Sequence, residues 1–115
     1  MQMPLLLSMA KYQLLMHCPD QASQALRQLS PEKLNKSQLK SYYLYRAAAE
    51  FLLQDSIWRN DLDACHLVPV EKAAMNAQEL EEAFVEENSH VWEGSPLWNV
   101  LRNWDQAPQP KAPVL

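Results

Sequence analysis

The chain has 115 residues, 48% hydrophobic and 21% charged, with a formal net charge of −4 at pH 7. This balance is typical of one folded domain with a modest core, and it excludes a disordered chain. The ten basic residues are scattered, which argues against a nucleic-acid partner because phosphates require clustered Lys and Arg. With Gly94 as its single glycine, the chain lacks the turn residues that connect β-strands, so we predict an all-α protein.

The sequence also bears on location. Its first ten residues, MQMPLLLSMA, are apolar but have no basic residue before the apolar run, and Lys11 follows directly. Since such a segment is too short to span a bilayer, it predicts neither a signal peptide nor a membrane anchor. Two cysteines, Cys18 and Cys65, do not make a disulfide framework. We therefore expect a cytoplasmic protein that has no membrane partner.

The first predicted helix runs from Pro4 to about His17, with proline at the first helical position. It carries two adjoining apolar stripes and one charge, Lys11. An exposed stripe of this size exceeds what soluble monomers usually tolerate, so we expect it to pack against a second chain in a two-fold homodimer. The alternative is that the last helix folds back over it. The stripe expected to self-associate consists of Leu5, Met9, Tyr12 and Met16; the other includes Leu7, Leu14 and Leu15.

A second helix is predicted to start at Pro19 and to end around Leu29, with Ala22, Ala25 and Leu26 facing inward. Asn35 and Gln38 then have the spacing of a capping box, which opens the central helix. Its sequence, QLKSYYLYRAAAEFLLQD over residues 38–55, is apolar over much of its circumference. We expect this helix to lie at the centre of the fold, with Leu52 buried.

Three more helices are predicted. One covers residues 57–67 and ends at Val68-Pro69, and one covers residues 70–88. The last follows Ser95-Pro96, an N-cap and a first-turn proline. The helix over 70–88 has an apolar seam and an acidic side. The seam, which we expect to be buried, consists of Val70, Ala73, Ala74, Ala77, Leu80 and Phe84, with Ala83 beside it. The acidic side consists of Glu79, Glu81, Glu82, Glu86 and Glu87. That acidic side is either a solvated face or a docking surface for a basic partner.

These elements predict a compact bundle of five or six helices in antiparallel hairpins. The single domain covers residues 1–105, and the Pro-rich residues 106–115 form a tail without periodicity.

The segment QASQALRQLSPEKLNKSQLKSYYLYRAAAEFLLQD carries a resemblance to a known family. Ala22, Leu26, Leu29 and Pro31 match the second helix of a helical hairpin, and Tyr43, Ala47 and Ala48 match the first helix of the next. In this pattern the segment resembles tetratricopeptide repeats. No second copy aligns at the repeat spacing of about 34 residues. The resemblance implies stacked helical hairpins that bind a peptide or protein on a concave surface.

The spacing of His, Cys and Glu residues gives little support for a metal site or a catalytic site. His17-Cys18 and Cys65-His66 contain zinc-binding residue types, but adjacent helical residues diverge by about 100°, so we expect no metal. Glu87 and His90 form half of a di-iron motif that must occur twice. With one glycine, the chain builds no phosphate-binding loop, so we expect no cofactor.

We therefore predict a non-enzymatic protein–protein interaction module, an adaptor or a subunit of a larger complex, that binds a peptide or helix. Two alternatives stay open: a small helical subunit of a regulatory or nucleic-acid-handling complex, and an enzyme with a site built on Glu50, His66 or the acidic helix. The last helix either enters a partner's groove or caps the core of its own domain. The residues expected to contact the partner are Tyr42, Tyr45, Arg46, Leu97, Trp98, Leu101 and Trp104.

Overall fold

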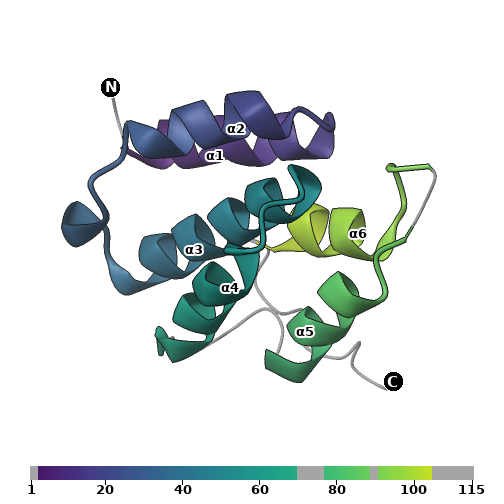
Figure 1. Ribbon diagram of the computed structural model, residues 1–115. Helices are drawn as coiled ribbons and strands as arrows, with labels where there is room; N and C mark the ends of the chain where they lie inside the picture. Colours follow the sequence, from purple (N-terminus) through teal and green to yellow (C-terminus); the bar gives the residue numbers. More distant parts are fainter. Residues whose placement is uncertain (1–2, 70–76, 89–90, 105–115) are drawn as a thin grey trace, which may run out of the picture.

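The structure is a computed structural model that describes residues 3–69, 77–88 and 91–104 (Figure 1). Within these ranges it contains six α-helices and one 3₁₀ turn, with no β-strand, which confirms the all-α prediction. The predicted domain boundary at residue 105 and the tail after it lie outside the described residues. The helices are α1 (Met3–Leu15), α2 (Pro19–Arg27), α3 (Lys36–Leu52), α4 (Trp58–Leu67), α5 (Ala77–Val85) and α6 (Pro96–Asn103), and the 3₁₀ turn is Pro31–Lys33.

The arrangement is centred on α3. The hairpin of α1 and α2 lies across one side of α3, and α4 turns back along its other side (Figure 1). The last helix, α6, packs against both α1 and α5. Helices from both ends of the sequence therefore meet in one core.

The start and the middle of α3 follow the sequence closely. The Asn35 side-chain oxygen accepts from the Gln38 main-chain N–H at 2.8 Å, and the Gln38 side chain accepts from the Asn35 N–H at 3.1 Å, which confirms the capping box. Leu44 and three consecutive alanines, residues 47–49, are buried, and their small side chains let neighbouring helices approach. Leu52 is only partly buried, because α3 ends there and its last turn reaches the surface.

Both α1 and α3 end in a Schellman motif, in which one left-handed residue closes the helix. In α1 that residue is His17, with φ at 60°, and the Cys18 N–H donates to the Gln13 oxygen at 2.8 Å. In α3 it is Gln54, with φ at 61°, and the Asp55 N–H donates to the Glu50 oxygen at 2.8 Å. Glycine is the usual residue at this position, so each helix end carries local strain.

The described part of the predicted 70–88 helix begins at Ala77, and the predicted seam residues Val70, Ala73 and Ala74 lie outside the described residues. Leu80, Ala83 and Phe84 are buried as predicted, whereas Ala77 is exposed because it stands at the first position of α5. Phe84 joins a cluster of rings at the α3–α4 connection, stacked on Trp58 at 5.3 Å and edge-on to Phe51 at 5.5 Å.

Three tryptophans fasten the C-terminal part of the chain to its N-terminal half. The indole N–H of Trp92 donates to the Leu14 oxygen at 2.9 Å, and that of Trp98 donates to the Leu15 oxygen at 3.1 Å. The Trp104 indole N–H donates to the Ser41 hydroxyl at 3.0 Å. The last helix therefore does fold back on α1, and it covers the C-terminal end of that helix.

Candidate interaction site

Five of the seven residues predicted to contact a partner lie in the core. Their exposed fractions run from 0 to 6%, because the apolar stripes that carry them face other helices of the same domain. A partner cannot reach them while the domain is folded, so they are withdrawn as candidate binding residues: Tyr42, Tyr45, Leu97, Leu101 and Trp104. The remaining two, Arg46 and Trp98, are partly exposed.

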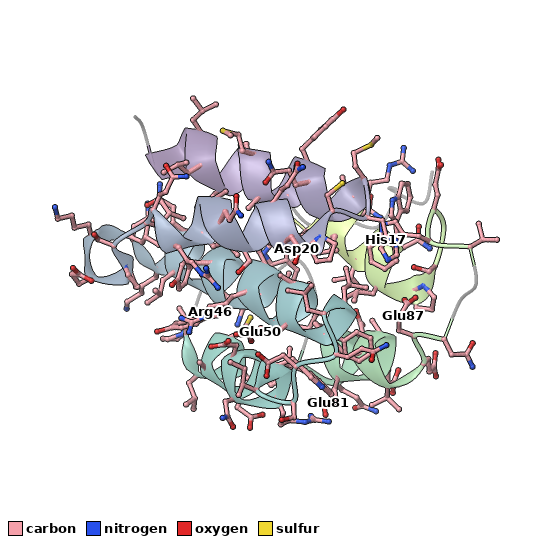
Figure 2. All side chains as sticks on the ribbon, turned by 45° about the horizontal axis from the view of Figure 1, so that its top comes forward. His17, Asp20, Arg46, Glu50, Glu81 and Glu87 are labelled. Atoms are coloured by element: carbon pink, nitrogen blue, oxygen red, sulfur yellow. The ribbon has the colours of Figure 1, made fainter. Side chains whose placement is uncertain are left out.

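Arg46 belongs to a polar cluster between α3 and α4. Its Nε lies 3.6 Å from a Glu50 oxygen and 3.3 Å from an Asp61 oxygen, and its Nη1 donates to the Tyr42 hydroxyl at 3.2 Å. Figure 2 shows the Arg46 and Glu50 side chains together on one side of the molecule. This arginine therefore links α3 to α4, and its guanidinium group already has hydrogen-bond acceptors within the domain.

Glu50 is unusual within that cluster. Burial, followed by a side-chain hydrogen bond and like-charge repulsion from Asp61, raises the pKa of Glu50 to about 8. One of its oxygens is buried without a hydrogen-bond partner among the described residues. This shift in pKa favours the protonated form of the Glu50 carboxyl group near neutral pH.

A small pocket of about 310 Å³ opens beside Glu50, lined also by Arg27, Tyr42 and Arg46. A protonated carboxyl group in a pocket is the kind of group that enzymes use as a general acid. Here, however, the carboxyl group lies 3.6 Å from Arg46, which also contacts Asp61. His17 and His66 both lie elsewhere, so the described part of the chain does not pair this carboxyl group with an imidazole.

The stripe predicted to self-associate lies on the surface along α1, and we call it the α1 stripe. Its members are exposed by 51% at Leu5, 38% at Met9, 62% at Tyr12 and 59% at Met16. The opposite side of α1, with Leu6, Leu7, Ala10 and Leu14, is buried against the core. The last helix covers the end of α1 and leaves this stripe accessible.

A second surface feature begins where the α1 stripe ends. It is an open cleft of about 700 Å³ between the α1–α2 turn, the α3–α4 connection and the segment after α5, and we call it the connection cleft. Phe51, Trp58 and Trp92 contribute rings to it. Its polar lining includes His17, Gln54, Asp55 and Glu87. Figure 2 shows His17 and Glu87 on the same side of the molecule, one from each half of the chain.

Three polar side chains of the connection cleft, His17, Asp55 and Glu87, are held by neighbours in the fold. The His17 ring stacks on Trp92 with centroids 4.9 Å apart. An Asp55 oxygen accepts from the Ile57 N–H at 3.1 Å, and a Glu87 oxygen accepts from the Leu97 N–H at 2.9 Å. Each carboxylate therefore uses one oxygen to hold the start of a following helix. No single stretch of sequence contains this cleft, which explains why sequence reasoning missed it.

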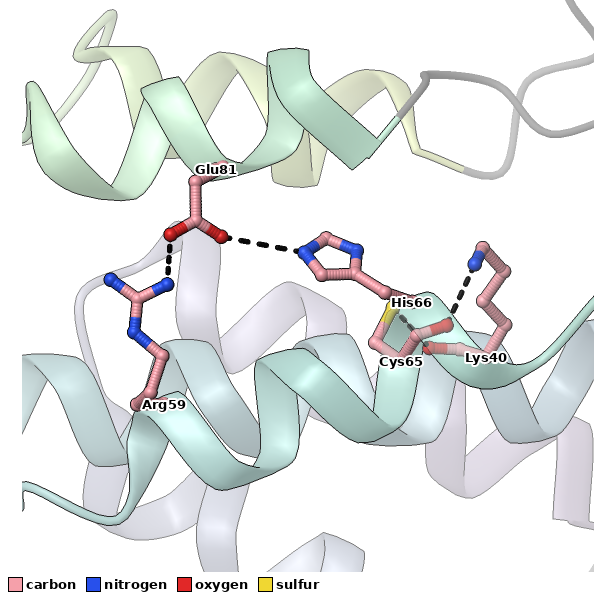
Figure 3. Close-up of polar contacts among 5 residues, drawn as sticks. All are labelled: Lys40, Arg59, Cys65, His66 and Glu81. Atoms are coloured by element: carbon pink, nitrogen blue, oxygen red, sulfur yellow. Dashed lines mark hydrogen bonds and ion pairs between the residues drawn. The ribbon is translucent and has the colours of Figure 1, made fainter.

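Part of the acidic side of α5 forms contacts within the domain. Figure 3 shows Glu81 reaching from α5 to Arg59 and to His66 on α4, with its second oxygen 3.5 Å from the His66 Nε2. Burial, with the positive charge of Lys40 as the next cause, lowers the pKa of His66. Lys40 donates to the Cys65 main-chain oxygen at 2.7 Å and so caps the end of α4. These residues fasten helices together.

The sequence predicts that Cys65 binds no metal, and its surroundings in the structure bear on that prediction. Cys65 is fully buried, and burial raises the pKa of its thiol to about 11, as fits a small core side chain. The described residues contain no group of three or more His, Cys, Asp or Glu side chains that would hold a metal ion. Among the described helices, none has the length and apolar character needed to cross a membrane.

Comparison with known proteins assigns the chain to no family. No protein family, curated protein or solved structure matches the chain. The similarity to tetratricopeptide repeats therefore remains a resemblance of one segment, and the functional argument depends on the surface itself.

Proposed function

We propose that the protein is a non-enzymatic interaction module that pairs with another helix along the α1 stripe. The observation that carries the proposal is the exposure of four large apolar side chains in one line, three on α1 and Met16 directly after it, while the opposite side of α1 is already buried. Contiguous apolar surface of this kind marks interaction sites in soluble proteins. The contact of Glu50 with Arg46 and the stacking of His17 on Trp92 give further support, because each group is held by a neighbour in the fold.

The spacing of the α1 stripe favours a helical partner. Leu5, Met9, Tyr12 and Met16 recur at intervals of four, three and four residues, the pattern of the contact line between two paired helices. The methionines add flexible thioethers that adapt to a facing surface. A helix laid along α1 would therefore bury these side chains without rearranging the domain.

The lack of charge favours a second copy of the same chain as that helix. Lys11 is the only charged residue in α1, and the stripe is bordered by the uncharged Ser8 and Gln13. Two such helices meet about a two-fold axis without like-charge repulsion. The line of contact on a 13-residue helix is only about 20 Å long, so we expect a dissociable dimer.

Sedimentation equilibrium over concentrations from about one to several hundred micromolar tests this proposal. The wild-type mass should rise from 13.3 kDa toward twice that value as concentration increases. Tyr12→Glu should keep the protein monomeric, because it buries a charge in the seam. The matched control is Leu67→Glu, which changes a side chain that is 81% exposed at the end of α4 and should leave the dimer intact. A mass of 13.3 kDa at every concentration would refute the proposal.

A further inference from the structure

We propose that the connection cleft binds a Lys or Arg side chain presented by an extended segment of a partner protein. This inference rests on the proposed role as an interaction module and names the partner's chemistry at a surface separate from the α1 stripe. Its basis is the combination of two fixed carboxylates, an aromatic lining and, among the described lining residues, no basic side chain other than that of His17.

The negative charge of the cleft favours a positively charged ligand. Asp55 and Glu87 both line the cleft, and the lining residues that the structure describes include neither Lys nor Arg. Each carboxylate gives one oxygen to a main-chain N–H, from Ile57 and Leu97 respectively, so its direction is set before a ligand arrives. The second oxygen of each group is the acceptor that a cationic side chain would use.

The aromatic lining suits the aliphatic part of the same side chain. The face of the Trp58 ring is already used within the fold, by stacking on Phe84 at 5.3 Å and by the Arg59 guanidinium at 4.6 Å. One face of Trp92 is covered by His17. A ligand at these rings therefore meets mainly apolar edges, and attraction between a cation and a ring face contributes little. The methylene stem of Lys or Arg packs on such edges while its charged end reaches a carboxylate.

The backbone at the rim supports a functional role for the cleft. His17 and Gln54, the two left-handed residues other than glycine in the described chain, both line it. Glycine would relieve the strain at either position, and each instead places a polar side chain at the cleft. Strain of this kind is often retained where the side chain is needed for binding.

Accessibility favours a chain segment over a small molecule. His17, Gln54 and Asp55 are all exposed, so the cleft opens broadly to solvent along its rim. Small-molecule sites usually enclose most of the ligand surface. A cleft of about 700 Å³ that is open in this way suits a peptide that lies across it with one side chain inserted.

Selection from a displayed library of short random peptides tests the proposal without knowledge of the natural partner. We expect the enriched peptides to share a Lys or Arg flanked by apolar residues. Enrichment of acidic or purely apolar peptides, or no enrichment, would overturn the proposal. Peptides that enrich equally on the protein with Asp55→Asn and Glu87→Gln would also overturn it, because their binding would not depend on the cleft.

An enriched peptide is then titrated against variants by calorimetry. Asp55→Asn with Glu87→Gln removes both charges but keeps an oxygen to accept each main-chain hydrogen bond, and we expect about tenfold weaker binding. The control is Glu82→Gln with Glu86→Gln, which changes the net charge equally at exposed positions in α5 and just after it, outside the cleft, and should bind as wild type. Equal weakening in both double variants would mean a general charge effect and would overturn the site.

Agmatine, a free amine with a guanidinium group, serves as the small-molecule probe. Agmatine binding as tight as the peptide would assign the cleft to small cations and overturn the peptide proposal. The outcomes are independent of the α1 stripe: Tyr12→Glu should bind the peptide normally even where it abolishes self-association. Loss of the dimer with retained peptide binding would thus separate failure of the proposed function from failure of this inference.

Discussion

The indole N–H of Trp98 donates to the main-chain oxygen of Leu15 at 3.1 Å, and so joins the end of α1 to α6 across 83 positions of sequence. The Trp92 indole donates to the same oxygen at 3.0 Å. Oxygens in the last turn of a helix have no partner within that helix. The C-terminal part of the chain therefore supplies donors that the end of α1 lacks.

Trp92→Phe should lower the free energy of unfolding by about 1–2 kcal/mol, because the carbonyl groups of Leu14 and Leu15 lose a donor while most of the ring packing remains. Urea denaturation measures the effect. Trp58→Phe is the control, since the ring of Trp58 acts here through its stacking on Phe84. A denaturation midpoint unchanged by Trp92→Phe would show that water replaces the indole at no cost.

Leu44→Ala should cost about 2–5 kcal/mol of stability, since Leu44 in the middle of α3 is fully buried. Leu52→Ala should cost clearly less, because Leu52 is only partly buried. Leu53→Ala, at a side chain that is 42% exposed, gives the lower reference. Chemical denaturation of the three variants should rank them in this order. Equal losses at Leu44 and Leu53 would contradict the burial assigned to α3.

Glu50→Gln should stabilise the protein at pH 8 and have little effect at pH 4.5. The pKa of Glu50 is about 8 in the folded protein and near 4.5 when unfolded, so the folded state holds the proton more tightly. The stability that Glu50 contributes is thus fully present below pH 4.5 and is lost as the pH rises toward 8. Glutamine keeps a donor toward Asp61 and does not ionise.

Thermal denaturation of wild type and Glu50→Gln at several pH values measures this difference. The gap in Tm should widen steadily as the pH rises from 4.5 to 8 and stay constant above that. Asp63→Asn, at an exposed position on α4, controls for the loss of one negative charge. A gap that does not change with pH would mean that Glu50 ionises normally in the folded protein.

Gln54→Gly should raise the free energy of unfolding by about 1 kcal/mol, since glycine adopts the left-handed conformation at the end of α3 without strain. Gly94→Ala should have the opposite effect, because Gly94 has φ at 87°. Its site is open, with no atom within 4 Å of an added Cβ, so backbone strain is the only cause. A destabilised Gln54→Gly variant would indicate that the Gln54 side chain makes an important contact.

Features of the fold that depend on neighbouring residues were predictable from the sequence. The capping box at Asn35 and Gln38 and the N-cap at Ser95 need only a few adjacent residues, and both are present. The exposed stripe on α1 and the buried face of α2 also follow from helical periodicity. The ends of α1 and α3 were harder to place, because His17 and Gln54 occupy positions where glycine usually signals the end of a helix.

The candidate binding residues were harder to predict for a different reason. Periodicity shows that a helix has an apolar side but not whether a partner or the same domain covers it. Leu97, Leu101 and Trp104 form such a side, and the domain itself covers them. The connection cleft was beyond sequence reasoning because it joins His17 to Glu87, and only tertiary packing brings these residues together.

The bonds from Trp92 and Trp98 to the end of α1 also have a consequence for protein synthesis. A growing chain on the ribosome makes α1, and then α2 and α3 that pack on it, long before these tryptophans emerge from the exit tunnel. Until then the end of α1 lacks the two indole donors and its cover by α6. The docking of α6 and its flanking tryptophans on α1 must therefore be completed late in translation or after release. During that interval the nascent α1 is a natural target for chaperones that recognise apolar segments.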